Sequence, residues 1–282
     1  MRKKPPIKAG LIGRPLSRSL SPVLFGIFAD LAGEEIVYEL RETEPRDLRT
    51  AIETARMEGW RGFNVTIPYK GDVCALLDLA DPAARAAGAV NAVRFGRAGL
   101  EGYNTDARAL LQIMGETGFA AAGKSAIIYG SGGAAASAGW ALGRSSAASV
   151  VFSARNTENA SALARRLTEF FPATSFSAAP FGRPAAPPDI LVNATPLGMY
   201  QPGRPPCEPA RGMFCADLAY SPAGTELAAA AAAAGAVSAD GLALLVRQAA
   251  LSLRFWTGLP AGDIVEFSIE ADRLFRKKLK GE

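Results

Sequence analysis

The stretch Ser125-Ala126-Ile127-Ile128-Tyr129-Gly130-Ser131-Gly132-Gly133-Ala134 decides the fold class of this chain. Its first five residues form a short apolar run that predicts a buried strand, and the Ala-rich run after it predicts a helix. The glycines lie in the turn between them, where they let backbone N–H groups approach a phosphate at the positive end of the helix dipole. This strand-turn-helix context is typical of a dinucleotide-binding domain, whereas an isolated glycine cluster would equally fit a flexible turn.

The residues around this stretch continue the alternation of strands and helices. A helix is expected over 107–117 before it, and an Ala-rich helix over 225–234 after it. Further apolar runs predict strands at 149–153, 190–193, 213–218 and 236–239. Strands that alternate with helices form a parallel sheet covered by helices, so this part of the chain predicts a Rossmann-type domain.

The N-terminal part of the chain alternates in the same way. Strands are expected at 7–12, 37–40 and 62–67, and helices at 22–32, 45–57 and 70–79. The tail has only helical patterns, at 242–255 and 263–280, so it must pack on one of the two α/β units, and most simply on the first. We therefore expect a two-domain α/β protein whose C-terminal helices pack back on the N-terminal domain.

Composition limits the class of protein. The chain has 282 residues, 49% of them hydrophobic and 21% charged, which indicates about two globular domains and excludes wholesale disorder. The net charge of +4 comes largely from two terminal clusters, Arg2-Lys3-Lys4 and Arg276-Lys277-Lys278-Lys280, which we expect to be solvated ends. A nucleic-acid reader would show basic residues interleaved with aromatic ones, so no nucleic-acid partner is expected.

Missing residue types exclude several chemistries. The chain has no histidine, so Ser-His and Cys-His pairs and His-ligated metals are excluded, and no metal is expected. Its cysteines, Cys74, Cys207 and Cys215, lack Cys-x-x-Cys spacing and indicate no disulfide framework, which fits a reducing cytoplasm. No apolar run reaches the ~18 residues that cross a bilayer, and the N-terminus lacks a signal-peptide pattern, so we expect no membrane partner and a cytoplasmic location.

The end of the second strand of the nucleotide unit distinguishes NAD from NADP. An enzyme that prefers NAD usually has an acidic residue there, which accepts a hydrogen bond from the ribose 2′-hydroxyl. This chain has Ser153-Ala154-Arg155-Asn156 instead. A guanidinium pairs with a 2′-phosphate through charge-assisted bonds, so Arg155 favours NADP, although a solvent-facing loop arginine is the alternative.

Four further segments carry polar residues at the ends of expected strands, where open α/β sheets bind ligands. They are 17–22 (SRSLSP), 62–70 (GFNVTIPYK), 88–93 (GAVNAV) and 102–106 (GYNTD). Together they supply hydroxyls, an amide, an ammonium and a carboxylate. This set suits a small, polyhydroxylated, anionic molecule better than a lipid or a polymer.

Two of these residues suit proton transfer during hydride exchange. Oxidation of an alcohol by a nicotinamide needs a group that exchanges the hydroxyl proton and stabilises negative charge on the oxygen. Lys70 can do both, and Asp106 would hold its ammonium in place and offset the cost of its desolvation. The alternative for either residue taken alone is a solvated surface charge.

Structural roles compete with ligand binding at the other candidates. Ser21 precedes a proline and has the chemistry of a helix N-cap. Asn91 could instead cap or bridge a turn, and Thr66 could simply end a strand. Tyr220, which follows a strand, and Gln248, on the tail helix, are weak candidates when each is taken alone.

Taken together, these motifs resemble those of the shikimate dehydrogenase family, which includes quinate/shikimate and aminoshikimate dehydrogenases. The most specific parts are Asn64-Val65-Thr66-Ile67-Pro68-Tyr69-Lys70 and Asn104-Thr105-Asp106, in this order. Other matching segments are 10–13, Ser19-x-Ser21-Pro22, 88–91, the glycine loop, 193–199, 217–222, Asp240-Gly241 and Gln248-Ala249. The resemblance therefore covers nearly the whole chain.

The resemblance implies an enzyme that reversibly reduces 3-dehydroshikimate to shikimate with NADP, as a monomer or homodimer. Residues 1–106 would form the substrate-binding domain, 107–241 the NADP-binding domain, and 242–282 the helices that complete the first. Lys70 and Asp106 match the catalytic pair. Residues that match substrate contacts are Ser19 and Ser21, at the carboxylate, with Thr66, Asn91, Tyr220 and Gln248. Residues that match cofactor contacts are Gly130, Ser131, Gly132, Gly133, Ala134, Ala154, Arg155, Asn156, Thr195, Leu218 and Gly241.

The chain departs from the family pattern at several positions. Arg18 stands where members commonly have His, and further departures are Ala92, Ala154, Asn156 and Leu244. An arginine beside the serines would tighten anion binding or mark a different acid substrate. Two alternatives therefore stay open. One is a paralogous quinate/shikimate or aminoshikimate dehydrogenase, and the other is a non-catalytic NADP(H)-binding sensor, which the retained catalytic pair disfavours.

Overall fold

The structure, a computed structural model, describes residues 5–282, so the basic cluster Arg2-Lys3-Lys4 lies outside the described residues. The chain divides into two compact units. The first comprises the described part of 1–85 together with 89–105 and 245–282, and the second comprises 86–88 and 106–244. Each unit contains a 6-stranded sheet with helices, which confirms the predicted two-unit α/β fold class.

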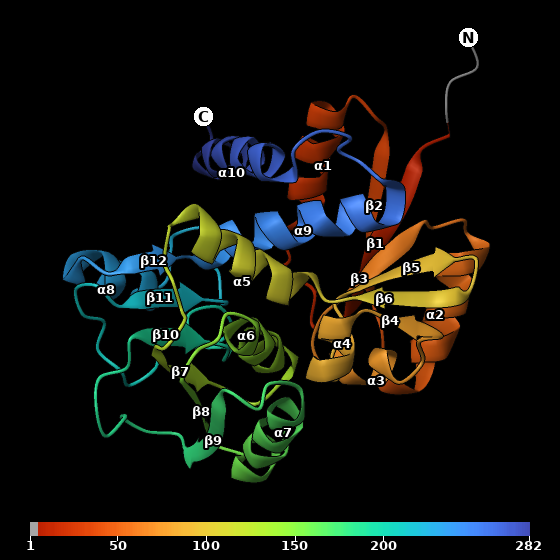
Figure 1. Ribbon diagram of the computed structural model, residues 1–282. Coiled ribbons are helices and arrows are strands. Elements are labelled where there is room, and N and C mark those ends of the chain that lie inside the picture. Colours follow the sequence, from red (N-terminus) through yellow and green to blue (C-terminus); the bar gives the residue numbers. More distant parts are fainter. Residues whose placement is uncertain (1–4) are drawn as a thin grey trace. The chain divides into compact units, whose positions relative to one another are not determined.

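The first unit is built on a mixed sheet with the strand order β2-β1-β3-β5-β6-β4 (Figure 1). Its strands are β1 (Ile7–Gly13), β2 (Ile36–Glu42), β3 (Gly62–Val65), β4 (Leu79–Ala80), β5 (Ala92–Gly96) and β6 (Gly99–Tyr103). β1 pairs in parallel with β2 and β3, whereas β5 runs antiparallel to β3 and β6. The expected strands correspond to β1, β2 and β3, and the sequence patterns did not indicate the other three.

The helices of this unit follow the expected order, with one correction. They are α1 (Ser21–Ala32), α2 (Leu48–Met57) after a 3-10 turn (Pro45–Asp47), α3 (Lys70–Cys74), α4 (Pro82–Ala87), α9 (Gly241–Thr257) and α10 (Ile264–Lys280), of which α4 and α9 extend into the second unit. The expected helix 70–79 ends at Cys74. Asp78 N–H donates to Leu100 O (2.9 Å), and the following residues pair with β6 as β4, so strand pairing replaces the end of the helix.

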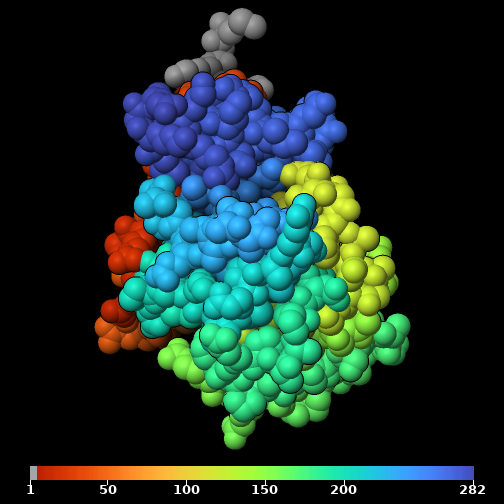
Figure 2. All heavy atoms as spheres, turned by 90° about the vertical axis from the view of Figure 1, so that its left-hand side faces the viewer, coloured from red at the N-terminus to blue at the C-terminus, as the bar shows by residue number. Residues whose placement is uncertain are grey.

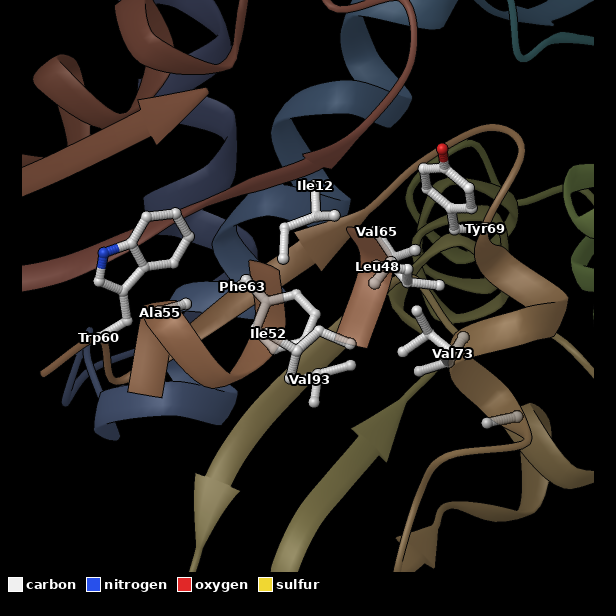
Figure 3. Close-up of a cluster of buried hydrophobic side chains, with 12 residues drawn as sticks. Ile12, Leu48, Ile52, Ala55, Trp60, Phe63, Val65, Tyr69, Val73 and Val93 are labelled. Atoms are coloured by element: carbon white, nitrogen blue, oxygen red, sulfur yellow. The ribbon is translucent and has the colours of Figure 1, made fainter. Parts of the chain in front are cut away.

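Apolar side chains from the sheet and α2 form the core of the first unit (Figure 3). Ile12 and Phe63 from the sheet are fully buried, as is Val93, and Leu48 and Ile52 of α2 pack against them. The spacing of four between the two α2 residues places them on one face of the helix, which explains why α2 covers this sheet.

The tail helices pack within the first unit, as predicted. Phe267 of α10 lies with its ring centroid 5.3 Å from that of Phe28 in α1, and Trp256 of α9 stacks at 5.8 Å on Phe25. α10 also carries the exposed Lys277, and its atoms are the dark-blue spheres in Figure 2. The amphipathic pattern of the tail therefore specifies which side is buried.

The second unit contains an all-parallel sheet with the order β12-β11-β10-β7-β8-β9. Its strands are β7 (Ser125–Tyr129), β8 (Ser149–Ala154), β9 (Ser175–Pro180), β10 (Ile190–Asn193), β11 (Phe214–Asp217) and β12 (Val237–Ala239). This is the doubly wound order of a Rossmann domain, and the strand order reverses between β7 and β10. Ligands in such sheets bind beyond the carboxyl ends of the strands at that reversal.

The helices of the second unit are α5 (Thr105–Glu116), α6 (Gly133–Arg144), α7 (Thr157–Phe170) and α8 (Glu226–Ala234). The sequence patterns indicated α5, α6 and α8 but not α7 or the strand β9 after it. In the part of the chain from residue 5 to 282, no helix is both long and apolar enough to span a membrane.

Candidate active site

The two serines expected to hold an acid group lie at the end of the loop between β1 and α1 and at the first residue of α1. Leu16 N–H donates to Glu42 Oε2 (3.0 Å), and Ser19 N–H donates to Leu16 O (2.9 Å), which anchors the loop. Ser21 N–H donates to Ser19 Oγ (3.3 Å), so the two serines lie together. The N-cap of α1 is Leu20, without a side-chain cap, because the helix already begins at Ser21. The capping alternative for Ser21 is therefore wrong.

Thr66 lies one residue beyond β3 and packs against the end of β1. Its N–H donates to Ile12 O (3.0 Å), and Arg14 N–H donates to Ile67 O (2.8 Å). A Cβ at Gly13 would overlap the Thr66 side chain, so glycine is needed there for this close approach. Two adjacent backbone hydrogen bonds within the first unit therefore hold Thr66 beside Arg14, where the loop to the serines begins.

Lys70 is the first residue of α3. The preceding Tyr69 is fully buried and donates its hydroxyl to Thr43 O (2.5 Å). Burial, with the negative charge of Glu44, raises the pKa of Tyr69, so it stays a neutral donor and anchors the start of the helix. The Lys70 carbonyl accepts the N–H of Val90 (3.0 Å), the residue directly before Asn91. Backbone pairing therefore brings the Lys70 and Asn91 segments together.

Asn91 and Gln248 are joined through Thr105. Asn91 Nδ2 donates to Thr105 Oγ1 (2.8 Å) and to Gln248 Oε1 (3.3 Å), while Thr105 N–H donates to Asn91 Oδ1 (2.7 Å). Asn91 and Thr105 are buried and Gln248 is half-buried. The structure therefore brings two predicted substrate residues together from positions 157 apart in the sequence.

Asp106 immediately follows Thr105, in the first turn of α5. The contacts of Thr105 with Asn91 hold the first residue of this helix. Lys70 belongs to the first unit and Asp106 to the second. Their pairing stays a prediction.

The glycine loop lies at the carboxyl end of β7, at the reversal of strand order. Gly130 has φ +119°, and a Cβ there would lie 2.7 Å from Ala194 O, so only glycine fits. Gly132 is the N-cap of α6, and Gly133 is the first residue of that helix. A Cβ at Gly132 would have no protein atom within 4 Å, which leaves room for a ligand at the helix N-terminus. These features fit a pyrophosphate group.

The segment after β8 lines an open pocket of about 490 Å³, formed by Arg155, Asn156, Thr157 and Glu158. Ala154 ends β8 and is buried, whereas Arg155 is exposed. Asn156 Oδ1 accepts the N–H of Asn159 (2.9 Å) and caps α7. A guanidinium beside a helix N-terminus is suited to a phosphate group.

The remaining candidates of the second unit lie at the ends of its other strands. Leu218 N–H donates to Asn193 O (2.9 Å), and Thr195 N–H donates to Asn193 Oδ1 (3.0 Å). A Cβ at Gly241 would overlap Ala219 and lie 2.9 Å from Tyr220 Cβ, so glycine permits close packing there. The carboxyl ends of β10 and β11 and the start of α9 therefore gather Thr195, Leu218, Tyr220 and Gly241.

The buried carboxylate of Asp217 holds the segments at the ends of β10 and β11 together, a role that the sequence patterns do not indicate. Asp217 accepts hydrogen bonds from Asn193 Nδ2 (2.8 Å), Thr225 Oγ1 (2.6 Å) and Ala219 N–H (3.1 Å). Burial raises the pKa of Asp217 to about 6 despite these hydrogen bonds. Because Asn193 in turn accepts from Thr195, Asp217 holds Thr195 in place through one intermediary. The sequence signal for Asp217 is that it begins the segment 217–222, which matches the family motif.

Asn64 and Ser252, which were not among the predicted site residues, hold Asn91 in place in the first unit. Asn64 Nδ2 donates to Asn91 O (2.9 Å) and to Ser252 Oγ (2.8 Å), and Ser252 is fully buried. Asn64 stands in a quoted motif, but no sequence signal marks Ser252. Among residues 5–282 no group of three Cys, Asp or Glu side chains is arranged to hold a metal ion.

Comparisons with known proteins agree with this geometry. Residues 11–93 match the family model described as the shikimate dehydrogenase substrate binding domain. The shikimate dehydrogenase (NADP(+)) of Geobacter metallireducens is 35% identical over 261 residues, which cover 89% of this chain and 91% of that protein.

Two solved structures are similar to this chain over nearly its whole length. The shikimate 5-dehydrogenase of Thermus thermophilus, in complex with NADP(H) and shikimate, has a TM-score of 0.80 at 31% identity and covers 95% of this chain and 99% of that one. The 5-ketofructose reductase of a Gluconobacter species has a TM-score of 0.83 at 28% identity, covering 96% and 99%. The sequence identities and coverage show that this chain belongs to the shikimate dehydrogenase family.

Proposed function

We propose that this protein is an NADP-dependent shikimate dehydrogenase, which reversibly reduces 3-dehydroshikimate to shikimate. The observation that carries the proposal is the gathering of Lys70, Thr66, Asn91 and Gln248 within one unit of a chain that belongs to this family. These groups supply an ammonium, a hydroxyl and two amides, which is the hydrogen-bonding set that a small polyhydroxylated acid requires.

Lys70 and Asp106 are proposed as the catalytic pair. The bound nicotinamide supplies or accepts the hydride. In the direction of oxidation, the Lys70 amine accepts the proton of the substrate hydroxyl, and in reduction the Lys70 ammonium donates a proton to the carbonyl oxygen. The Asp106 carboxylate orients that ammonium and favours its charged form.

The other substrate contacts divide by chemistry. Ser19, at the end of the loop, and Ser21, the first residue of α1, lie together and are proposed to donate their hydroxyls to the carboxylate. Thr66, Asn91 and Gln248 are proposed to bind the ring hydroxyls. Tyr220, three residues beyond β11 in the second unit, is proposed as a further substrate contact.

The second unit is proposed to bind NADP. The loop of Gly130, Ser131, Gly132, Gly133 and Ala134 suits the pyrophosphate, because the Gly132 position is open and adjoins a helix N-terminus. The pocket at Ala154, Arg155 and Asn156 suits the 2′-phosphate. Thr195, Leu218 and Gly241 are proposed to lie near the nicotinamide.

We propose that the chain forms one domain that binds the substrate and one that binds the nucleotide. Residues 1–106 and 242–282 form the substrate domain, and 107–241 form the nucleotide domain. A cytoplasmic location is proposed, where the cysteines at 74, 207 and 215, which are not joined in disulfides, would stay reduced. A monomer or homodimer, with no nucleic-acid partner, is proposed.

The test is an assay of the purified protein with shikimate or quinate as substrate and NADP⁺ or NAD⁺ as cofactor, followed by the absorbance of reduced nicotinamide. A further arm uses 5-ketofructose and NADPH. We expect the highest kcat/KM for shikimate with NADP⁺. A preference for quinate or 5-ketofructose would contradict the proposed substrate. NADPH binding without turnover of any substrate would indicate a sensor.

A further inference from the structure

Ser252 of α9 is the centre of a buried polar network in the first unit. It is fully buried, and its hydroxyl donates to Gln248 O (2.8 Å) one turn earlier in the helix. Its oxygen accepts from Asn64 Nδ2 (2.8 Å) and lies 3.3 Å from Thr105 Oγ1. Because the Ser252 hydroxyl proton points to Gln248 O, the Thr105 hydroxyl is the donor in that last contact, and its other acceptor, Gln248 Oε1, lies farther away at 3.5 Å. Three separate segments therefore meet at one hydroxyl.

Asn64 uses both of its amide protons within this network. Its Oδ1 accepts the hydroxyl of Tyr38 (2.9 Å), and its two amide protons go to Asn91 O (2.9 Å) and Ser252 Oγ (2.8 Å). All of its strong hydrogen-bonding capacity except one acceptor lone pair is used inside the protein. Asn64 therefore acts on the backbone of Asn91 and on Ser252.

The backbone fixes the orientation of both neighbouring side-chain amides. Thr105 N–H can only donate, so the atom of Asn91 that faces it must be Oδ1, and Asn91 Nδ2 must face Gln248. Gln248 must then turn its Oε1 toward Asn91. At the other end Gln248 Nε2 donates to Leu245 O (2.9 Å), which can only accept. The Thr105 N–H and the Leu245 carbonyl therefore require the same orientation of the two side-chain amides, with Asn91 Nδ2 donating to Gln248 Oε1. We call this chain of hydrogen bonds, Thr105–Asn91–Gln248, the amide relay.

We propose that Ser252 and Asn64 are positioning residues that hold this relay, and that Gln248 consequently presents an N–H donor, not a carbonyl acceptor, to the substrate. This inference rests on the proposed function, and it specifies which kind of ligand atom Gln248 binds. Gln248 Nε2 has a second proton beyond the one used on Leu245 O, so the ligand atom opposite it must be an acceptor oxygen. Ser252 acts through the Gln248 carbonyl and Thr105 and does not touch the substrate.

The first test compares Ser252→Ala with Ser268→Ala. Ser268 is also fully buried, on α10 of the same unit, and its hydroxyl donates to Val265 O (2.9 Å) within its own helix. In Ser252→Ala the buried Asn64 N–H and Thr105 O–H lose a partner, and the relay is released. We expect kcat/KM for shikimate to fall about tenfold, with the KM for NADP⁺ changed less than about twofold. Equal effects of Ser252→Ala and Ser268→Ala on shikimate would contradict the proposal.

A second readout does not depend on turnover. In ¹⁵N-labelled protein, the side-chain amide resonances of Asn91 and Gln248 should be sharp and slow to exchange in the wild type and in Ser268→Ala. They should broaden or exchange rapidly in Ser252→Ala. Unchanged side-chain amides in Ser252→Ala would overturn the positioning role even if activity fell. If the wild type turned over no substrate, the proposed function would be wrong. The amide resonances of Asn91 and Gln248 would still show whether Ser252 positions these side chains.

A milder variant covers failure of Ser252→Ala to fold. Tyr38→Phe removes only the hydroxyl that donates to Asn64 Oδ1 and keeps the ring that stacks on Phe25 at 4.0 Å. We expect the same direction of change in the amide resonances, with a smaller loss of kcat/KM for shikimate, of about threefold. Wild-type resonances and shikimate kinetics in Tyr38→Phe would contradict the proposed role of Asn64.

Discussion

Replacement of Asp217 by asparagine tests the electrostatics of the second unit. Asp217 is 2% exposed, and burial raises its pKa from 3.8 to about 6. An asparagine side chain at this position has nearly the same shape. Its carbonyl oxygen can still accept from Asn193 and Ala219, and its amide can donate to the Thr225 hydroxyl, which continues to accept from Ala228 N–H. The substitution therefore removes a buried charge and the hydrogen bond that the Thr225 hydroxyl donates to Asp217, and the loss of that bond is the same at every pH.

The size and sign of the effect follow from linkage. A carboxyl group whose pKa is raised in the folded state stabilises the fold fully below its unfolded pKa, and that contribution is lost as the pH rises through the folded pKa. At about 1.4 kcal/mol for each pH unit, a rise from 3.8 to about 6 corresponds to about 3 kcal/mol. Because pH 4 already lies just above the unfolded pKa, part of this contribution is lost there, and wild type should lose about 2 kcal/mol relative to Asp217→Asn between pH 4 and pH 7.5.

The assay is urea unfolding of both proteins at pH 4 and pH 7.5. Asp189→Asn provides a matched control in the same unit, because hydrogen bonds from Ser125 lower the pKa of Asp189. Its contribution is present above the unfolded pKa and is lost only at lower pH, so the difference between wild type and Asp189→Asn should change little across this window. The same free-energy difference between wild type and Asp217→Asn at both pH values would refute the reasoning.

Three substitutions test the proposed ligand contacts. Gly130→Ala should weaken NADPH binding at least about tenfold in a fluorescence titration, because the new Cβ would lie 2.7 Å from Ala194 O; an unchanged Kd would contradict this. Arg155→Ala should lower kcat/KM for NADP⁺ about tenfold to hundredfold and leave NAD⁺ unaffected, and an equal loss with both cofactors would argue against a 2′-phosphate contact. Arg18→Ala should raise the KM for the acid substrate, and an unchanged KM would exclude Arg18 from anion binding.

Local sequence patterns predicted the second unit well, because its determinants are short. The run before Gly130 specifies a strand and a tight turn, and the φ of +119° at that position explains the glycine. The strand β9 and helix α7 escaped prediction. β9 alternates half-buried and exposed positions at the sheet edge, so it lacks the continuous apolar run of the central strands.

The first unit shows where local patterns are insufficient. The antiparallel β5–β6 hairpin and the pairing of β4 with β6 depend on contacts between segments, so the patterns indicated only a helix over 70–79. The hydrogen bond between Asn64 and Ser252 joins residues 188 apart. No local signal marks Ser252 as part of that network. Motifs could identify Asn91 and Gln248 separately, but only the fold relates them.

The rate of NADP⁺ reduction by shikimate in wild type and Lys70→Ala tests the central claim most directly. If Lys70 transfers the proton, the substitution should lower kcat by about two to four orders of magnitude with a smaller effect on NADP⁺ binding. Turnover of Lys70→Ala at the wild-type rate would contradict the account, because proton transfer would then need another group.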